Sequence, residues 1–228
     1  MSKNLLKRII TSIILLSLLI FVNFSNKYIF ISAIYLLGII ICVEAYNMFL
    51  RLVGIKSLKN NIYKKFNFKF LILNIITFLY VFFVFCNLSI KIYILEGPVF
   101  FLFVVSICFF TDIGGYVLGK IIGGKKLSKI SPNKTISGAI GSFLFSLIPL
   151  ILCSYFHYLN LEFNLSNITF SLLVSLISQV GDLFISYLKR KGKIKDTGKI
   201  LPGHGGVLDR VDGIIFAVPF SYFLLKII

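Results

Sequence analysis

Charged residues are scarce in this sequence, and acidic residues are the scarcest of them. Only 14% of the 228 residues are charged, and eight are aspartate or glutamate. Water-soluble domains usually carry about 25% charged residues. Hydrophobic residues make up 58% of the chain and stand in long runs. This composition excludes a water-soluble domain and indicates an integral membrane protein.

Other absences restrict the chemistry. The four cysteines all stand in apolar runs and form no Cys-x-x-Cys pair, so neither disulfides nor a zinc site is implied. No Gly-x-Ser-x-Gly turn and no Ser–His–Asp order points to acyl transfer. Gly114 to Lys120 fits the glycine and lysine spacing of a P-loop, but Ile121 stands where Ser or Thr is required and a membrane helix precedes the glycine. A P-loop is therefore excluded.

Positive charge, in contrast, is abundant. The formal net charge is +16, and the basic residues stand in short clusters between apolar runs. They are not interleaved with aromatic side chains on one face, as a surface that stacks bases would require. The pattern favours anionic lipid headgroups and phosphate ligands as partners, and no nucleic acid is expected.

Seven apolar segments approach the roughly 20 residues that a spanning helix needs. They are residues 9–25, 28–44, 70–87, 92–111, 136–156, 167–187 and 207–227. With a cytoplasmic N-terminus, 21 of the 24 lysines and arginines fall on the cytoplasmic side, as the positive-inside rule requires. No small-x-small cleavage site follows the first segment, so it is interpreted as a membrane anchor. We predict an all-α, polytopic integral membrane protein with about seven transmembrane helices and a cytoplasmic N-terminus.

All five aspartates lie at or near the predicted cytoplasmic ends of the fourth, sixth and seventh segments, whereas the three glutamates are scattered. The aspartates are Asp112, Asp182, Asp196, Asp209 and Asp212. This clustering predicts one cytoplasmic site built from three parts of the chain. We divide the chain into N-terminal helices with a basic loop, residues 1–111, and a catalytic membrane domain, residues 112–228. The loop 51–69 is basic and aromatic, typical of a segment at the lipid surface or of a topology signal.

Two helical patterns place polar side chains together. Gln179, Asp182 and Ser186 are spaced so that they share one helical face. Asp209 and Asp212 are three residues apart and can face one point. Hard oxygen ligands with few histidines favour Mg²⁺. A polar helix-packing cluster, or a buried salt bridge through the intervening arginine, would explain the same residues without a metal.

Two loops offer anion-binding groups. The stretch KIKDTGKILPGHGG, residues 193–206, combines lysines with glycines whose N–H groups can approach an anion. The stretch SPNKT places Ser131, Lys134 and Thr135 ahead of the fifth segment, which suits anion binding at a helix start. Carboxylates for a divalent cation beside groups for phosphates favour phosphoryl or nucleotidyl transfer to a lipid phosphate.

The stretch SYLKRKGKIKDTGKILPGHGGVLDRVD, Ser186 to Asp212, resembles the signature of the phosphatidate cytidylyltransferases, also called CDP-diacylglycerol synthases. Every fixed polar position of that signature is filled at the expected spacing. QVGDL and SPNKT also look like this family, and the resemblance covers about residues 112–213 closely. Asn133 stands where the family usually has lysine, and Lys120 where it often has arginine.

The resemblance implies an Mg²⁺-dependent transfer of CMP from CTP to phosphatidate, with metal ligation by Asp182 and Asp209. It leaves room for a second, monovalent cation such as K⁺ and implies a homodimer in the lipid bilayer. The place would be the inner (plasma) membrane, with the site facing the cytoplasm. The other catalytic residues implied are Lys189, Arg190, Lys195, Asp196, His204, Arg210 and Asp212. The substrate-binding residues implied are Asp112, Ser131, Lys134, Thr135, Gly205 and Gly206.

Three other classes of membrane protein could place acidic residues beside a lipid or phosphate substrate. A CTP-dependent lipid-alcohol kinase would instead transfer the γ-phosphate to a hydroxyl and release CDP. A transporter predicts carboxylates deep in several helices and inverted repeats, and neither is present. A CDP-alcohol phosphatidyltransferase would show its aspartates in a different order on adjacent helices. The kinase therefore remains as the alternative.

Overall fold

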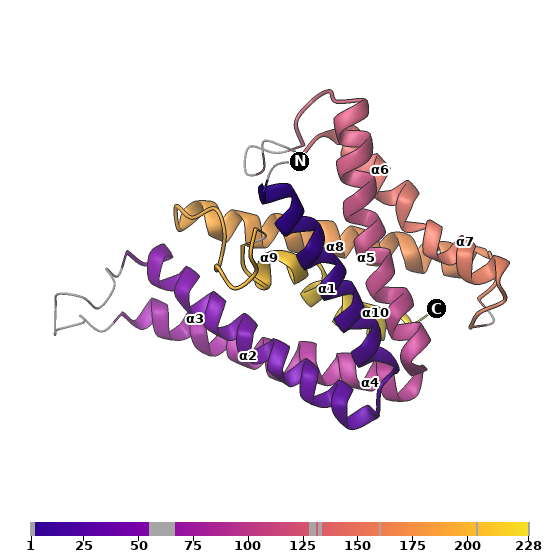
Figure 1. Ribbon diagram of the computed structural model, residues 1–228, viewed down its shortest axis with the longest axis horizontal. Helices are drawn as coiled ribbons and strands as arrows, with labels where there is room; N and C mark the ends of the chain where they lie inside the picture. The colour runs from indigo at the N-terminus through magenta and orange to yellow at the C-terminus, as the bar shows by residue number, and fades with distance from the viewer. Residues whose placement is uncertain are drawn as a thin grey trace. The chain divides into compact units, whose positions relative to one another are not determined.

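The computed structural model is built from helices, with no strand in the residues that it describes, which are 3–54, 67–127, 131, 134–159, 161–203 and 205–227 (Figure 1). The elements are α1 (Lys3–Phe24), α2 (Lys27–Leu52), α3 (Phe68–Leu79), η1 (Tyr80–Cys86), α4 (Asn87–Leu95), α5 (Gly97–Ile121), α6 (Ile136–Ser146), α7 (Ile148–Tyr155), α8 (Leu165–Lys191), α9 (Leu208–Val211) and α10 (Ile214–Leu224). The predicted all-α class is confirmed.

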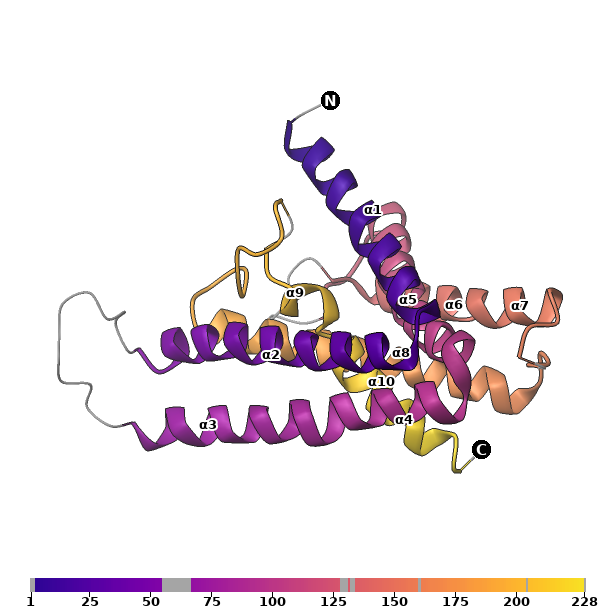
Figure 2. The ribbon, with the colours of Figure 1, turned by 60° about the horizontal axis from the view of Figure 1, so that its bottom comes forward.

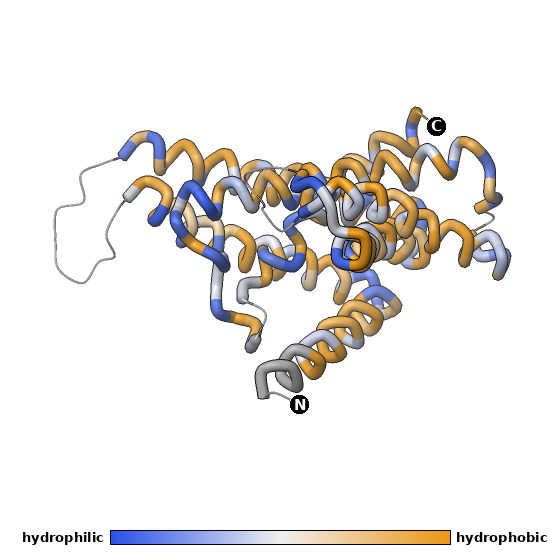
Figure 3. Tube along the Cα trace, turned by 90° about the horizontal axis from the view of Figure 1, so that it is seen from above, coloured by the Kyte–Doolittle hydropathy of each residue, from blue (hydrophilic) through white to orange (hydrophobic). Residues whose placement is uncertain are grey.

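Five helical stretches are long and apolar enough to cross a membrane. They are Lys27–Leu52, Phe68–Leu95, Gly97–Ile121, Ile136–Tyr155 and Leu165–Lys191. Hydrophobic residues run along the helices, and hydrophilic ones gather at helix ends and in connecting segments (Figure 3). The predicted membrane protein is therefore confirmed. The described apolar part of α1, Ile9–Phe24, is shorter, so the count of seven spans and the cytoplasmic N-terminus stay predictions.

Two predicted boundaries moved for local reasons. The third span extends to Leu95, because Gly97 adopts a positive φ of 88° and Pro98 then opens α5, and proline suits the first turn of a new helix. The last predicted segment, 207–227, is divided between α9 and α10 at Gly213, and Pro219 lies inside α10.

The chain forms two compact units that are interleaved in sequence: Met1–Ile90 with Leu188–Val211, and Lys91–Tyr187 with Asp212–Ile228. In the first unit, α2 and α3 lie side by side, and α3, η1 and α4 follow one another as one long helical stretch (Figure 2). Gly38 of α2 lies against Cys86, whose Sγ donates to the Ile34 carbonyl at 3.6 Å. The predicted division between residues 1–111 and 112–228 stays a prediction.

The second unit is organised by an unusually close contact between α5 and α6. Gly114 and Gly115 of α5 face Gly141 and Gly138 of α6, and a Cβ on Gly138 would come within 2.8 Å of the Gly115 carbonyl. Small residues at a helix interface let two backbones approach closely within a membrane. The contact brings the C-terminal half of α5 beside the start of α6, where the candidate substrate residues Lys134 and Thr135 stand.

Candidate active site

Asp209 at the start of α9 is the centre of a polar cluster in the first unit. Its Oδ1 accepts from Lys189 Nζ at 2.8 Å, and its Oδ2 accepts from the backbone N–H groups of Thr197 at 2.8 Å and Gly206 at 3.0 Å. The side chains of Lys189 and Asp209 are only 11% and 7% exposed. The predicted catalytic lysine and aspartate therefore form one nearly buried ion pair.

The hydrogen bonds of Asp209 decide its charge. Burial alone would raise the pKa of this carboxyl, but the hydrogen bonds from Lys189, Thr197 and Gly206 outweigh burial and hold the pKa below its usual range. Asp209 is therefore ionised at neutral pH.

The loop that surrounds Asp209 is shaped by its glycines. Leu201 and Gly205 exchange two backbone hydrogen bonds, at 2.9 and 3.2 Å, and close a tight turn. Gly205 has a φ of 87°, and a Cβ there would lie 3.1 Å from both Asp196 Cβ and Asp209 Oδ2. Glycine is required because L side chains rarely adopt this conformation and because the carboxylates leave no room.

A glutamate outside the predicted site, Glu44, binds the same loop. Glu44 of α2 is only 2% exposed. Its Oε1 accepts from Val207 N at 3.0 Å, and its Oε2 accepts from Leu208 N at 2.8 Å and Thr197 Oγ1 at 3.0 Å. The glycine-rich loop thus wraps the protein's own carboxylates. One feature of the sequence points to Glu44: it is a single acidic residue in an apolar run. Ionisable residues are costly at such positions and usually have a function.

The second unit holds a cavity of about 330 Å³ that collects the upstream candidates. It is lined by Asp112, Ser131, Lys134 and Thr135, together with Gln179 and Asp182. Four of the predicted substrate-binding residues and one predicted metal ligand therefore share one cavity, although they are spread over 71 positions of the chain.

Lys134 is placed by a short paired segment. Leu127 N donates to the Lys134 carbonyl at 2.8 Å, and Ile136 N donates to the Lys125 carbonyl at 3.0 Å. The Lys134 ammonium forms an ion pair with Asp182. Next to it, Thr135 caps α6, because its Oγ1 accepts from Gly138 N at 3.1 Å. Lys134 and Thr135, two of the residues predicted to bind an anion, thus stand directly before α6, as the sequence predicts.

Asp182 has a second carboxylate beside it. Its Oδ1 accepts from Ser186 Oγ at 3.2 Å, and the Asp212 carboxyl lies close enough to interact with it. Gly181 makes the approach possible: a Cβ there would lie 2.6 Å from the Phe216 ring and 3.1 Å from the Asp212 carbonyl. Adjacent carboxylates repel each other unless a proton or a cation lies beside them, and the Lys134 ammonium occupies that place next to Asp182.

These residues fit Mg²⁺, which typically uses one or two carboxylates and completes its shell with water and phosphate oxygens. Asp182 lines a cavity that also holds the hydroxyl groups of Ser131, Thr135 and Ser142, and the buried Asp212 lies next to Asp182. Among the described residues, no group of three or more His, Cys, Asp or Glu side chains forms a cage that would hold a metal by itself. Asp209, the other predicted ligand, lies in the other unit, and both its oxygens accept from protein donors.

Four of the remaining predicted catalytic residues lie on the surface. Arg190, Lys195, Asp196 and Arg210 are exposed in the first unit, where long basic side chains are accessible to a soluble anion. Asp112 in the second unit is exposed at its cavity. His204, Asn133 and most of the basic loop 51–69, residues 55–66, lie outside the described residues.

Comparison with known proteins decides the family. The model of the cytidylyltransferase family matches residues 46–228, which is most of the chain and includes Asp209 with its three hydrogen-bond donors and the residues of the cavity of about 330 Å³, but not Glu44. This chain belongs to the cytidylyltransferase family. Within the family it is similar to proteins named phosphatidate cytidylyltransferase, at 43% identity over 134 residues for that of Staphylococcus aureus (strain COL), 44% over 135 for that of Staphylococcus haemolyticus (strain JCSC1435) and 39% over 132 for that of Bacillus subtilis (strain 168).

The aligned parts cover 57–58% of this chain and 49–50% of the relatives. The chain therefore spans about half the length of the curated relatives it matches. The predicted family is confirmed, and its signature-like segment folds around Asp209. Two members of the polar cluster around Asp209, Glu44 and Thr197, were not among the predicted site residues.

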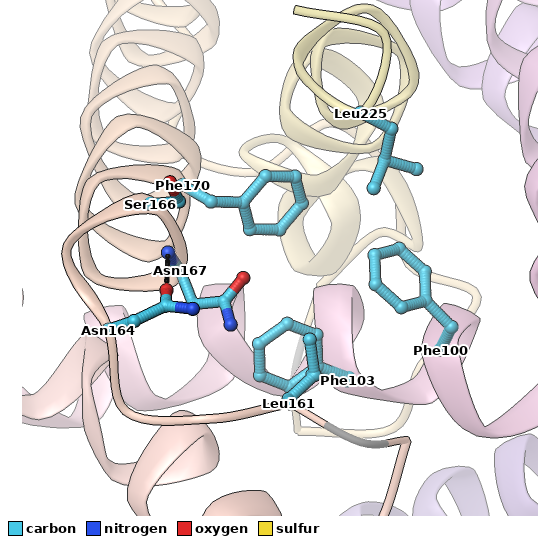
Figure 4. Close-up of a pocket in the computed structure, with 8 residues that line it drawn as sticks. All are labelled: Phe100, Phe103, Leu161, Asn164, Ser166, Asn167, Phe170 and Leu225. Carbon is cyan, nitrogen blue, oxygen red and sulfur yellow. Dashed lines mark hydrogen bonds between the residues drawn. The ribbon is translucent and has the colours of Figure 1, made fainter. Parts of the chain in front are cut away.

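A further cavity, of about 310 Å³, lies in the second unit among α5, α8 and the end of α10. The rings of Phe100, Phe103 and Phe170 point into it, with Leu161 and Leu225 completing the apolar wall (Figure 4). On its rim, Asn167 N donates to Asn164 Oδ1 at 2.9 Å. No charged side chain lines it among the described residues, so it adds no group that could act on a phosphate.

Proposed function

We propose that this protein is a phosphatidate cytidylyltransferase, which transfers CMP from CTP to phosphatidate and yields CDP-diacylglycerol and pyrophosphate in phospholipid biosynthesis. The observation that carries the proposal is the ordered cluster of Lys189, Thr197, Gly206 and Asp209, formed by the family's signature segment in a membrane-spanning chain. The names of the relatives support the choice of substrates.

In the proposed reaction, a phosphate oxygen of phosphatidate attacks the α-phosphorus of CTP. A new oxygen–phosphorus bond forms, the bond to the β-phosphate oxygen breaks, and pyrophosphate leaves. No side chain has to remove a proton, because a phosphate monoester is mostly ionised near pH 7. Lys134 lines the cavity of the second unit, and Arg190 and Lys195 are exposed in the first unit. Positive charge that faces the phosphates stabilises the transition state, and these three residues are the proposed sources of it.

The proposal includes Mg²⁺, which when bound would neutralise negative charge on the phosphate oxygens. Asp182 and Asp212 are the residues that would hold it in the second unit, and the family resemblance adds Asp209. A second, monovalent cation such as K⁺ and a homodimer are further parts of the proposal that rest on the resemblance.

The proposed place of the reaction is the cytoplasmic face of the plasma membrane. The five apolar helices support a multi-pass protein, and the excess of basic residues beside the candidate sites supports a cytoplasmic orientation. At that surface the acyl chains of phosphatidate can stay in the bilayer while its headgroup meets soluble CTP.

The proposal is tested with purified full-length chain in detergent, phosphatidate, Mg²⁺ and CTP labelled at the α-phosphorus. We expect label in the lipid fraction with equimolar pyrophosphate, and loss of both in Asp182→Asn, which removes one charge of the Asp182–Asp212 pair. CDP and an unlabelled lipid phosphate made from a lipid alcohol would favour the kinase instead. Absence of label from the lipid with the wild-type protein would refute cytidylyl transfer.

A second prediction concerns Lys134. Replacing it with methionine keeps an unbranched side chain one atom shorter but removes the ammonium group beside Asp182. We expect kcat/KM to fall about 100-fold, as when one charge-stabilising donor is removed. Lys125→Met is the matched control, because Lys125 is exposed in the same segment and does not line the cavity. Equal steady-state rates for the two variants would show that Lys134 does not act on substrate.

A further inference from the structure

We infer that Glu44 is a positioning residue for the proposed reaction: it holds the two ends of the loop, Thr197–Gly198 and Gly206–Leu208, in the conformation that presents Asp209. This inference rests on the proposed function. Glu44 belongs to α2, more than 150 positions before the loop, and its carboxylate accepts from Thr197, Val207 and Leu208 and packs against Gly198 and Gly206, all of them in or next to the loop. Any effect on the reaction must therefore pass through the loop.

The contacts of Glu44 and Asp209 are made to the same short stretch of backbone. Thr197 donates its hydroxyl to Glu44 and its backbone N–H to Asp209. Gly206 donates to Asp209, and the next two N–H groups, of Val207 and Leu208, donate to Glu44. The two carboxylates therefore bind neighbouring groups of one loop. Of the three donors to Asp209, Thr197 is also bound by Glu44, and Gly206 is next to Val207, which Glu44 binds.

Two glycines of the loop make room for this carboxylate. A Cβ on Gly198 would lie 2.9 Å from Glu44 Cδ, and a Cβ on Gly206 would lie 2.5 Å from Glu44 Oε2. Neither glycine has a positive φ, so close approach, and not backbone conformation, is what requires glycine there. These positions of the signature segment are therefore shaped by a buried protein carboxylate from outside that segment.

The geometry makes glutamine a poor substitute. Each oxygen of Glu44 accepts from a backbone N–H, Oε1 from Val207 and Oε2 from Leu208. A glutamine amide has only one acceptor oxygen, so in either orientation its NH₂ group faces a buried N–H donor. Leaving a buried donor without an acceptor is costly, and the loop must move away to relieve it.

The experiment compares the wild type with Glu44→Gln, Thr197→Val and the control Glu162→Gln, whose glutamate is exposed. Amide hydrogen exchange of peptides covering 195–209 reports the loop, peptides from α5 and α6 report the fold, and kcat and KM for CTP are measured per folded molecule. We expect Glu44→Gln to speed loop exchange at least about tenfold. We also expect kcat to fall about 100-fold with KM changed less than about threefold, because a small misplacement of a catalytic group costs this much.

Thr197→Val removes one of the three hydrogen bonds to Glu44 and should show a smaller effect in the same direction on both readouts. Loop exchange and kcat at the wild-type level in Glu44→Gln would overturn the inference. Faster loop exchange with an unchanged kcat would also overturn it, because Glu44 would then be only structural. An inactive wild type would refute the proposed function, while the exchange of the loop would still decide whether Glu44 holds it.

Discussion

Replacing Asp209 with asparagine is expected to lower kcat/KM for CMP transfer about a thousandfold, at the upper end of what loss of one charge-stabilising group costs. One oxygen of the carboxylate accepts a hydrogen bond from Lys189, and the other accepts from two backbone N–H groups. The asparagine oxygen can satisfy the two N–H groups, but its NH₂ then faces the Lys189 ammonium. Breaking a buried ion pair in this way should also cost about 3 kcal/mol of stability.

A double variant separates the loss of activity from the loss of stability. In Asp209→Asn with Lys189→Met, the NH₂ group faces an apolar side chain and no buried ammonium remains unpaired. Thermal unfolding in detergent should show the double variant more stable than Asp209→Asn alone, since removing both partners costs less than removing one. Both variants should keep the same roughly thousandfold loss of kcat/KM for CMP transfer. Activity restored together with stability would mean that Asp209 acts on the fold and not on the reaction.

Replacing Gly114 with alanine is expected to separate α5 from α6. The new Cβ would lie 2.5 Å from Phe145 Cβ and closer still to the Gly141 carbonyl. Both obstacles belong to or adjoin the backbone of α6, so no side-chain rotation relieves them. We expect a loss of about 3 kcal/mol, at the upper end for overpacking, and a fall in melting temperature of about 10 °C. Activity should fall too, because Lys134 and Thr135 precede α6 and share a cavity with Asp112 of α5.

Two glycine variants provide the comparison. Gly192→Ala should be tolerated, because the nearest atoms to its Cβ lie at 3.5 Å. Gly115→Ala should be intermediate, because its nearest obstacle, Ser142 Oγ at 2.6 Å, is a side-chain atom that can rotate. Melting temperatures that fall equally in all three variants would argue against the tight α5–α6 contact.

The sequence predicts that Asp209 and Lys189 belong to one site, but it does not predict that they form an ion pair. Lys189, Asp196, Gly205, Gly206 and Asp209 belong to one signature-like segment, and a segment of this length brings its own groups together through a single turn. Which atom binds which could not be predicted. The glycines were expected to approach a phosphate, whereas Gly206 N approaches Asp209 and Gly198 packs against Glu44.

The sequence by itself determined the membrane-spanning helical class, the family and most of the candidate residues. Apolar runs and signature spacing are local properties, and a chain of 58% hydrophobic residues has few other ways to satisfy its backbone in a bilayer. Only the tertiary structure decided that Lys134 forms an ion pair with Asp182 and that Glu44 accepts hydrogen bonds from the loop before Asp209. Such contacts join residues far apart in the chain, and they depend on how closely helices pack, which here is decided by where glycine leaves room for a backbone or a carboxylate.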